Sequence, residues 1–196
     1  MTKLVVISAG LSNPSSTRLL GDLLKAATVE ALGDAEVTTI ELRDLSQQLH
    51  DNLMTGFPSL KLADAIATVG EADGIIVVTP VFSASYSGLF KTFFDVLEEG
   101  LIDGKPVLIA ATAGTARHSL VLEHAMRPLF AYLHAVVMPT GVFAATDDFG
   151  SAGLQGRIDR AAAELAARPV SVRKLVEDGF DNPTPFEELL KLAAGR

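Results

Sequence analysis

Five short runs of residues, most of them continuously apolar, constrain the fold of this chain more than any other feature. Each run is too short for helical periodicity and therefore predicts a buried strand. The runs span residues 3–8, 36–42, 73–79, 107–112 and 135–142. Segments with helical spacing separate them, so the order βαβαβαβαβα predicts a parallel sheet covered by helices on both faces. Right-handed crossovers place the loops after the first, third and fourth strands along one edge, and five strands of this kind most often take the order 2-1-3-4-5.

The helical segments follow from apolar residues at three- and four-residue spacing. We expect helices over 17–33, 59–70, 87–97, 120–133 and 154–176, and a short amphipathic helix over 186–192. Pro169 could interrupt the fifth of these. Residues 43–58 are polar and predict an irregular segment. The length of 196 residues suits a single α/β domain over 1–196, with a C-terminal tail from about residue 178.

Composition excludes several classes of function. The chain has no cysteine, which rules out disulfides, thiolate catalysis and cysteine-ligated metals. The net charge of −8 argues against a nucleic-acid partner, because phosphate contacts need a basic face. No long apolar run or secretory signal is present, so we expect a cytoplasmic protein without a membrane partner. The spacing of His124 and His134 does not match a metal pair, so no metal site is expected.

The loop after the first strand, residues 8–18, predicts a phosphate site. A helix N-terminus attracts anions through its unpaired N–H groups. The hydroxyls of this loop would add donors, and Arg18 could add a bidentate contact. The pattern is neither a P-loop nor a G-x-G-x-x-G fingerprint, which favours a phosphate monoester. The alternative is a polar turn with an ordinary N-cap, but four hydroxyls within 12–17 exceed that need.

Two further loops, after the third and fourth strands, would lie at the same edge of the sheet. Residues 80–86 are small apart from Phe82 and Tyr86, and either ring could cover a flat ligand. In isolation this loop is better explained as a turn with two core aromatics, but its position after the central strand favours a ligand site. In residues 112–118, Gly114 could approach the far edge of the same ligand. Arg117 and His118 would stand at the mouth, although a surface histidine at a helix start is common.

Three motifs resemble the flavodoxin-like NAD(P)H-dependent FMN reductases. They are S-A-G-x(4)-S-S-T-R after the first strand, T-P-V-F-S-A-S-Y-S-G-L-F-K after the third, and A-T-A-G-T-A-R-H followed by E-H-A-M-R-P-L-F. The last is similar to the branch that supplies reduced flavin to two-component monooxygenases. The resemblance covers residues 3–145 and implies a flavodoxin-like three-layer sandwich with a five-stranded sheet.

The resemblance also implies roles for residues of the three loops. Ser8, Ser15, Ser16, Thr17 and Arg18 would hold the FMN phosphate. Pro80, Val81, Phe82 and Ser83 would line the isoalloxazine, with Thr112, Ala113, Gly114 and Thr115 on its other side and His118 at the mouth. Two residues depart from the family pattern: Phe82 replaces a common Tyr, and Thr115 replaces a common Gly.

The implied reaction is hydride transfer from NAD(P)H to FMN, which needs no side-chain acid or base, so no catalytic residue is assigned. Arg117 and Arg43 are candidates for the extra phosphate of NADPH. The implied partners are a flavin-dependent monooxygenase and further copies of the chain, as a homodimer or homotetramer. Alternatives are a quinone or azo reductase with bound FMN, a flavodoxin-type electron carrier and a non-enzymatic module.

Overall fold

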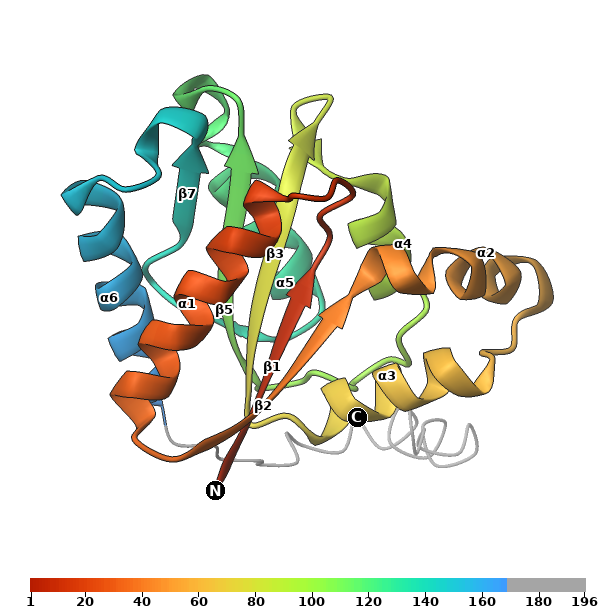
Figure 1. Ribbon diagram of the computed structural model, residues 1–196. Coiled ribbons are helices and arrows are strands. Elements are labelled where there is room, and N and C mark those ends of the chain that lie inside the picture. Colours follow the sequence, from red (N-terminus) through yellow and green to blue (C-terminus); the bar gives the residue numbers. More distant parts are fainter. Residues whose placement is uncertain (169–196) are drawn as a thin grey trace, which may run out of the picture.

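The computed structural model describes residues 1–168 and shows a sheet between two layers of helices (Figure 1). The strands run in the order β2-β1-β3-β5-β6, with β7 also paired to β5 and β4 paired to β3. Their bounds are β1 Thr2–Ser8, β2 Ala35–Glu41, β3 Gly74–Phe82, β4 Ser85–Tyr86, β5 Pro106–Ala113, β6 Val136–Val137 and β7 Val142–Ala145. All pairs are parallel except the antiparallel pair of β3 and β4. The predicted α/β class and strand order are confirmed.

Alternate residues of the strands face opposite layers, as the pleat requires. In β1, Leu4 and Val6 pack under α1 (Ser16–Leu32) and α6 (Ala152–Ala166), which lie side by side in Figure 1. Val5 and Ile7 pack on the other face, against helices of the middle of the chain. These helices are α2 Ser46–Thr55, α3 Leu60–Glu71, α4 Gly88–Asp95 and α5 Arg127–Tyr132. The sandwich therefore has two separate cores.

The polar segment over 43–58 is not irregular, and this prediction was wrong. It forms the 3-10 helix η1 (Leu42–Leu45), then α2, which ends at Gly56 in the left-handed conformation. Buried Leu42, Leu45 and Leu49 supply helical spacing on one narrow face. The polar residues around them hide that spacing in the sequence, because only one side of these helices touches the core.

The predicted fifth strand is split into β6 and β7, and together with the additional short strand β4 this makes seven strands rather than five. Between them, Met138 and Pro139 offer their carbonyl oxygens to Arg127 instead of to a strand. The predicted helix over 120–133 contains a π-helical segment, η3 (Leu122–Met126), before α5. Pro128 in the first turn of α5 lacks an N–H donor, which is consistent with irregular hydrogen bonding in this region.

Four helices begin at a serine whose hydroxyl accepts a backbone N–H. Ser15, Ser59, Ser87 and Ser151 cap α1, α3, α4 and α6 respectively. The predicted helix over 154–176 is present as α6 up to Ala166, and its remainder from 169 lies outside the described residues. The predicted helix over 186–192 and the tail from 178 lie outside them as well. No helix in residues 1–168 is long and apolar enough to cross a membrane.

Candidate functional site

The three loops meet at the carboxyl-terminal edge of the sheet, because β1, β3 and β5 are adjacent and parallel. Ser8 at the end of β1 is in register with Val78, and Pro80 with Thr112. In Figure 1 these loops stand together at the top of the sheet. The closest link is a buried hydrogen bond of 2.8 Å between the hydroxyls of Thr17 and Thr112. It joins the loop after β1 to the loop after β5.

The loop after β1 has the features of a phosphate cradle. The Ser8 hydroxyl is fully buried and has no hydrogen-bond partner within the described residues. A Cβ on Gly10 would lie 2.2 Å from the Ser15 Oγ, so only glycine fits this close approach. Ser15 caps the 17-residue helix α1, whose first turn points its N–H groups into the loop. The residues present therefore fit a phosphate monoester, with Ser16 exposed at the rim.

Arg18 lies on the flank of α1 rather than facing the cradle freely. Its Nε donates to Asp22 at 2.9 Å, and its Nη1 donates to Glu41 of β2. The hydrogen bond to Asp22, followed by that to Glu41, raises the pKa of Arg18 above its ordinary value. These contacts commit two of its nitrogens to carboxylates, so the role of Arg18 as a phosphate donor stays a prediction.

The loop after β3 is a tight hairpin that projects from the sheet edge. Val81 pairs with Tyr86 and Phe82 with Ser85, so Ser83 and Ala84 form a two-residue turn. Both have positive φ, 48° and 66°, as type I′ hairpins require, although neither is glycine. The Thr79 hydroxyl braces the base of the hairpin by accepting the Ser87 N–H at 3.0 Å.

The two aromatic rings predicted to cover a ligand take different positions. Tyr86 is half-buried and packs on Phe90, with ring centroids 5.7 Å apart. Phe82 is 49% exposed at the hairpin. Phe82 is therefore the ring available to a ligand at this edge, and Tyr86 belongs to the core.

The loop after β5 forms the opposite side of the site. Gly114 and Thr115 are exposed, and no atom lies within 4 Å of the position of a Cβ on Gly114. A 3-10 helix, η2 (Ala116–His118), follows. Arg117 is exposed and His118 is half-buried. The structure thus leaves open space beside Gly114, as a flat ligand requires.

Comparison with known proteins shows which family this chain belongs to. Residues 2–150 match the family model described as NADPH-dependent FMN reductase. The chain belongs to this family. The NAD(P)H:FMN oxidoreductase class and the FMN and NADPH ligands, predicted from the motifs, agree with this membership.

Two curated relatives of this FMN reductase family member differ in the reductant they are named for. "FMN reductase (NADPH)" from Pseudomonas aeruginosa is 38% identical over 84% of this chain and 90% of its own. "NADH-dependent FMN reductase SfnF" from Pseudomonas fluorescens is 39% identical over the same shares, 84% and 90%. A solved oxidoreductase from Corynebacterium diphtheriae has a TM-score of 0.83 and 51% identity, and covers 85% of this chain and 95% of its own.

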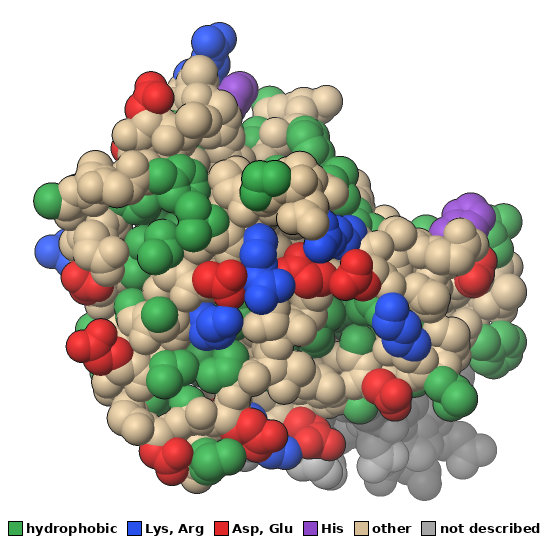
Figure 2. Space-filling view, viewed as in Figure 1, with side chains coloured by type: hydrophobic (Ala, Val, Ile, Leu, Met, Phe, Trp, Pro, Cys, Tyr) green, Lys and Arg blue, Asp and Glu red, His purple; other side chains and the backbone are tan. Residues whose placement is uncertain are grey.

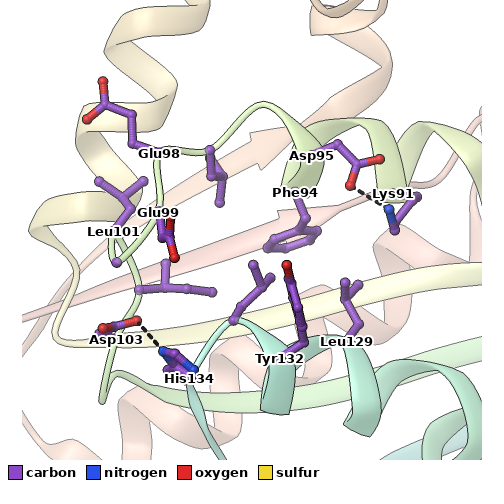
Figure 3. A pocket seen from close by; sticks show the side chains of 14 residues that line it. Lys91, Phe94, Asp95, Glu98, Glu99, Leu101, Asp103, Leu129, Tyr132 and His134 are labelled. Atoms are coloured by element: carbon purple, nitrogen blue, oxygen red, sulfur yellow. Dashed lines mark hydrogen bonds and ion pairs between the residues drawn. The ribbon is translucent and has the colours of Figure 1, made fainter. Parts of the chain in front are cut away.

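The family member also has a pocket of about 720 Å³ away from the three loops (Figure 3). It lies between α4, the segment 97–103 and α5, and Phe94, Leu129 and Tyr132 line it. Lys91 pairs with Asp95 at one end and His134 with Asp103 at the other. None of the predicted site residues lines this pocket, so it belongs to a different surface.

Two residues of the site formed by the three loops were not predicted from the sequence. Gly10 is needed for the close approach to Ser15, and Thr79 braces the hairpin. A single glycine two residues beyond a strand was the available signal for the first. The role of Thr79 depends on a partner eight residues away and had no signal in the sequence.

Proposed function

We propose that the three loops hold FMN and that the chain transfers hydride from NAD(P)H to it. One observation carries the assignment of the site: the buried, unpartnered hydroxyl of Ser8 at the foot of a cradle that Gly10 keeps open. A buried hydroxyl without a partner costs free energy, which a phosphate oxygen accepting its hydrogen bond would recover. The bound flavin supplies the redox chemistry, as its ring accepts the hydride.

The side chains of the site would bind and orient rather than react. The first-turn N–H groups of α1, with the hydroxyls of Ser15, Ser16 and Thr17, would surround the phosphate. The ring would lie between Pro80–Ser83 and Thr112–Thr115, where Phe82 is exposed and Gly114 leaves room. Positioning two reactants in one orientation is itself a large part of such catalysis.

The test is a multiple-turnover assay without oxygen. Purified protein is mixed with NADPH and excess FMN, and the absorbance of both is followed. Many turnovers per molecule of native protein would support the proposed reaction. Weaker FMN binding by a Ser8→Ala variant would support the assignment of the site. A single turnover or none, despite bound FMN, would contradict it. Parallel assays with a quinone and an azo dye as acceptors would distinguish the rival reductases.

We propose that reduced FMN leaves this site for a flavin-dependent monooxygenase. The similarity of A-T-A-G-T-A-R-H and E-H-A-M-R-P-L-F to the monooxygenase-supplying branch supports this role, as does the exposure of Phe82 and Gly114 at the mouth of the site. NAD(P)H is produced in the cytoplasm, where we place the protein. A micromolar or weaker dissociation constant for reduced FMN would support release, whereas retention of FMN through gel filtration would contradict it.

We also propose a homodimer or homotetramer that uses α5. Tyr132 is 82% exposed beside the half-buried Leu129, and both line the pocket in Figure 3. By contrast, Phe90, Phe93 and Phe94, the other candidate interface residues, pack in the core. Light scattering of the native protein and of Tyr132→Asp would test this surface: a smaller assembly for the variant supports it, and an unchanged mass contradicts it.

A further inference from the structure

Arg117 differs from the other arginines that flank the three loops, because it has no carboxylate partner within residues 1–168. Arg18 is paired with Asp22 and Glu41. Arg43 lies 3.6 Å from Asp44, and Arg157 lies 3.9 Å from Asp148. A guanidinium left without an anion at the mouth of a binding site is available to a ligand, whereas the paired ones are largely neutralised.

The Arg117 side chain is nevertheless oriented. Its Nε donates to the hydroxyl of Thr115 at 3.0 Å, within the same loop. This contact occupies one edge of the guanidinium and leaves both terminal nitrogens free to donate. Two parallel N–H groups match two oxygens of a phosphate dianion, which a point charge such as lysine does not. Figure 2 shows blue and purple side chains, Lys or Arg and His, projecting at the top of the molecule over the loop after β5.

We infer that Arg117 binds the 2′-phosphate of NADPH and makes NADPH the preferred reductant. The inference rests on the proposed function, because it concerns the nucleotide that reduces FMN at this site. The protein carries a net charge of −8 and would repel a dinucleotide with an additional phosphate. An unpaired cation at the point of contact offsets that repulsion locally. The two curated relatives are about equally similar in sequence to this chain but are named for different reductants, so overall sequence similarity does not determine the reductant. A small number of local residues must therefore determine it.

The position of Arg117 also favours it over Arg43. Under the proposed function, NADPH would approach the flavin ring between the hairpin and the loop after β5, and Arg117 belongs to that loop. Arg43 follows β2, which the sheet order places three strands away from β5. Its Nη1 donates to the carbonyl oxygen of Ser12 at 3.2 Å, so it supports the phosphate cradle instead. Of the two candidates for the extra phosphate, the structure therefore favours Arg117.

The experiment compares NADPH and NADH as reductants of FMN in the native protein, Arg117→Ala and Arg117→Lys. The native protein should prefer NADPH. In Arg117→Ala, kcat/KM for NADPH should fall at least about tenfold, as expected for a lost charge-assisted hydrogen bond, while the value for NADH stays within about twofold. Arg117→Lys should recover part of the loss. Arg160→Ala, an exposed arginine of α6, is the matched control and should change neither value.

A second readout needs no turnover. Adenosine 2′,5′-bisphosphate should inhibit the native protein more strongly than adenosine 5′-monophosphate, and Arg117→Ala should abolish the difference. Native preference for NADH, an unchanged NADPH-to-NADH ratio in Arg117→Ala, or an equal loss for both reductants would overturn the inference while FMN reduction persists. Absence of FMN turnover with either reductant in the native protein would instead contradict the proposed function.

Discussion

Thr17 and Thr112 share a hydrogen bond between their hydroxyls, which lie 2.8 Å apart and are almost completely buried. Thr17 belongs to the first turn of α1 and Thr112 to the end of β5, 95 residues later. The pair joins the loop that would hold the FMN phosphate to the loop that would line its ring. This hydrogen bond fixes the distance between the two loops, and the binding of a ligand that contacts both of them therefore depends on it.

Breaking this pair from one side should destabilise the fold more than removing it altogether. Thr112→Val leaves the Thr17 hydroxyl buried without a partner, and Thr17→Val does the same for Thr112. Each single variant should lower the free energy of unfolding by about 1–3 kcal/mol, and the double variant should lower it by less than either single variant does. Urea denaturation of the four proteins measures the coupling. Strictly additive losses would show that the two hydroxyls do not stabilise each other.

Gly10→Ala should weaken FMN binding while leaving the protein folded. The new Cβ would lie 2.2 Å from the Ser15 Oγ and 3.3 Å from the Thr17 Cβ, so the cradle must shift. We expect the dissociation constant for FMN, measured by quenching of flavin fluorescence, to rise at least about tenfold, since several charge-assisted contacts depend on this backbone.

The matched control for Gly10→Ala is Gly156→Ala on α6, where a Cβ would meet no atom within 4 Å. This control should bind FMN as the native protein does. It should also gain about 0.5–1 kcal/mol of stability, because alanine favours a helix interior. Equal FMN affinity in Gly10→Ala and in the control would contradict the role of Gly10 in the phosphate site.

The sequence predicted the sheet order and the meeting of the three loops, for a physical reason. Continuously apolar runs such as residues 74–78 must be buried on both faces of the sheet, which leaves few architectures. Parallel strands with right-handed crossovers then bring the loops after β1, β3 and β5 to one edge. The edge at which the three loops meet could be predicted from these rules, because its position depends on topology rather than on individual contacts.

Features that depend on tertiary partners could not be predicted in this way. Leu42, Leu45 and Leu49 form a narrow apolar face that only packing reveals as helical. The pairing of Arg18 with Glu41, from a neighbouring strand, could not be predicted either, and the role of Arg18 as a phosphate donor stays a prediction. The fifth strand is likewise interrupted where Arg127 binds the carbonyl oxygens of Met138 and Pro139. Each of these pairings is invisible in local sequence patterns.

The hairpin turn at Ser83 and Ala84 should be strained, since both residues have positive φ. Ala84→Gly should relieve that strain and raise the free energy of unfolding by up to about 1 kcal/mol. The converse change, Gly33→Ala, places a Cβ at φ 75° with no steric neighbour within 4 Å and should cost about 1 kcal/mol. Thermal or urea unfolding measures both. A loss of stability in Ala84→Gly would show that the turn carries no strain that glycine relieves.

The ion pair of Glu123 and Arg127 should make stability depend on pH at the acid end. The hydrogen bond from Arg127 is the largest cause that holds the pKa of Glu123 below its ordinary value of 4.5. A carboxylate with a lowered pKa in the folded state contributes stability above its unfolded pKa, and this is lost as the pH falls through the folded value. Because the Glu123 side chain is 52% exposed, the contribution is about 0.5 kcal/mol.

Glu123→Gln should therefore be slightly less stable than the native protein at pH 7 and equally stable near pH 3, in urea unfolding at both. Glu30→Gln, which removes an exposed carboxylate of α1, is the control for overall charge. A Glu123→Gln deficit that is the same at both values of pH would show that the charge of Glu123 contributes nothing.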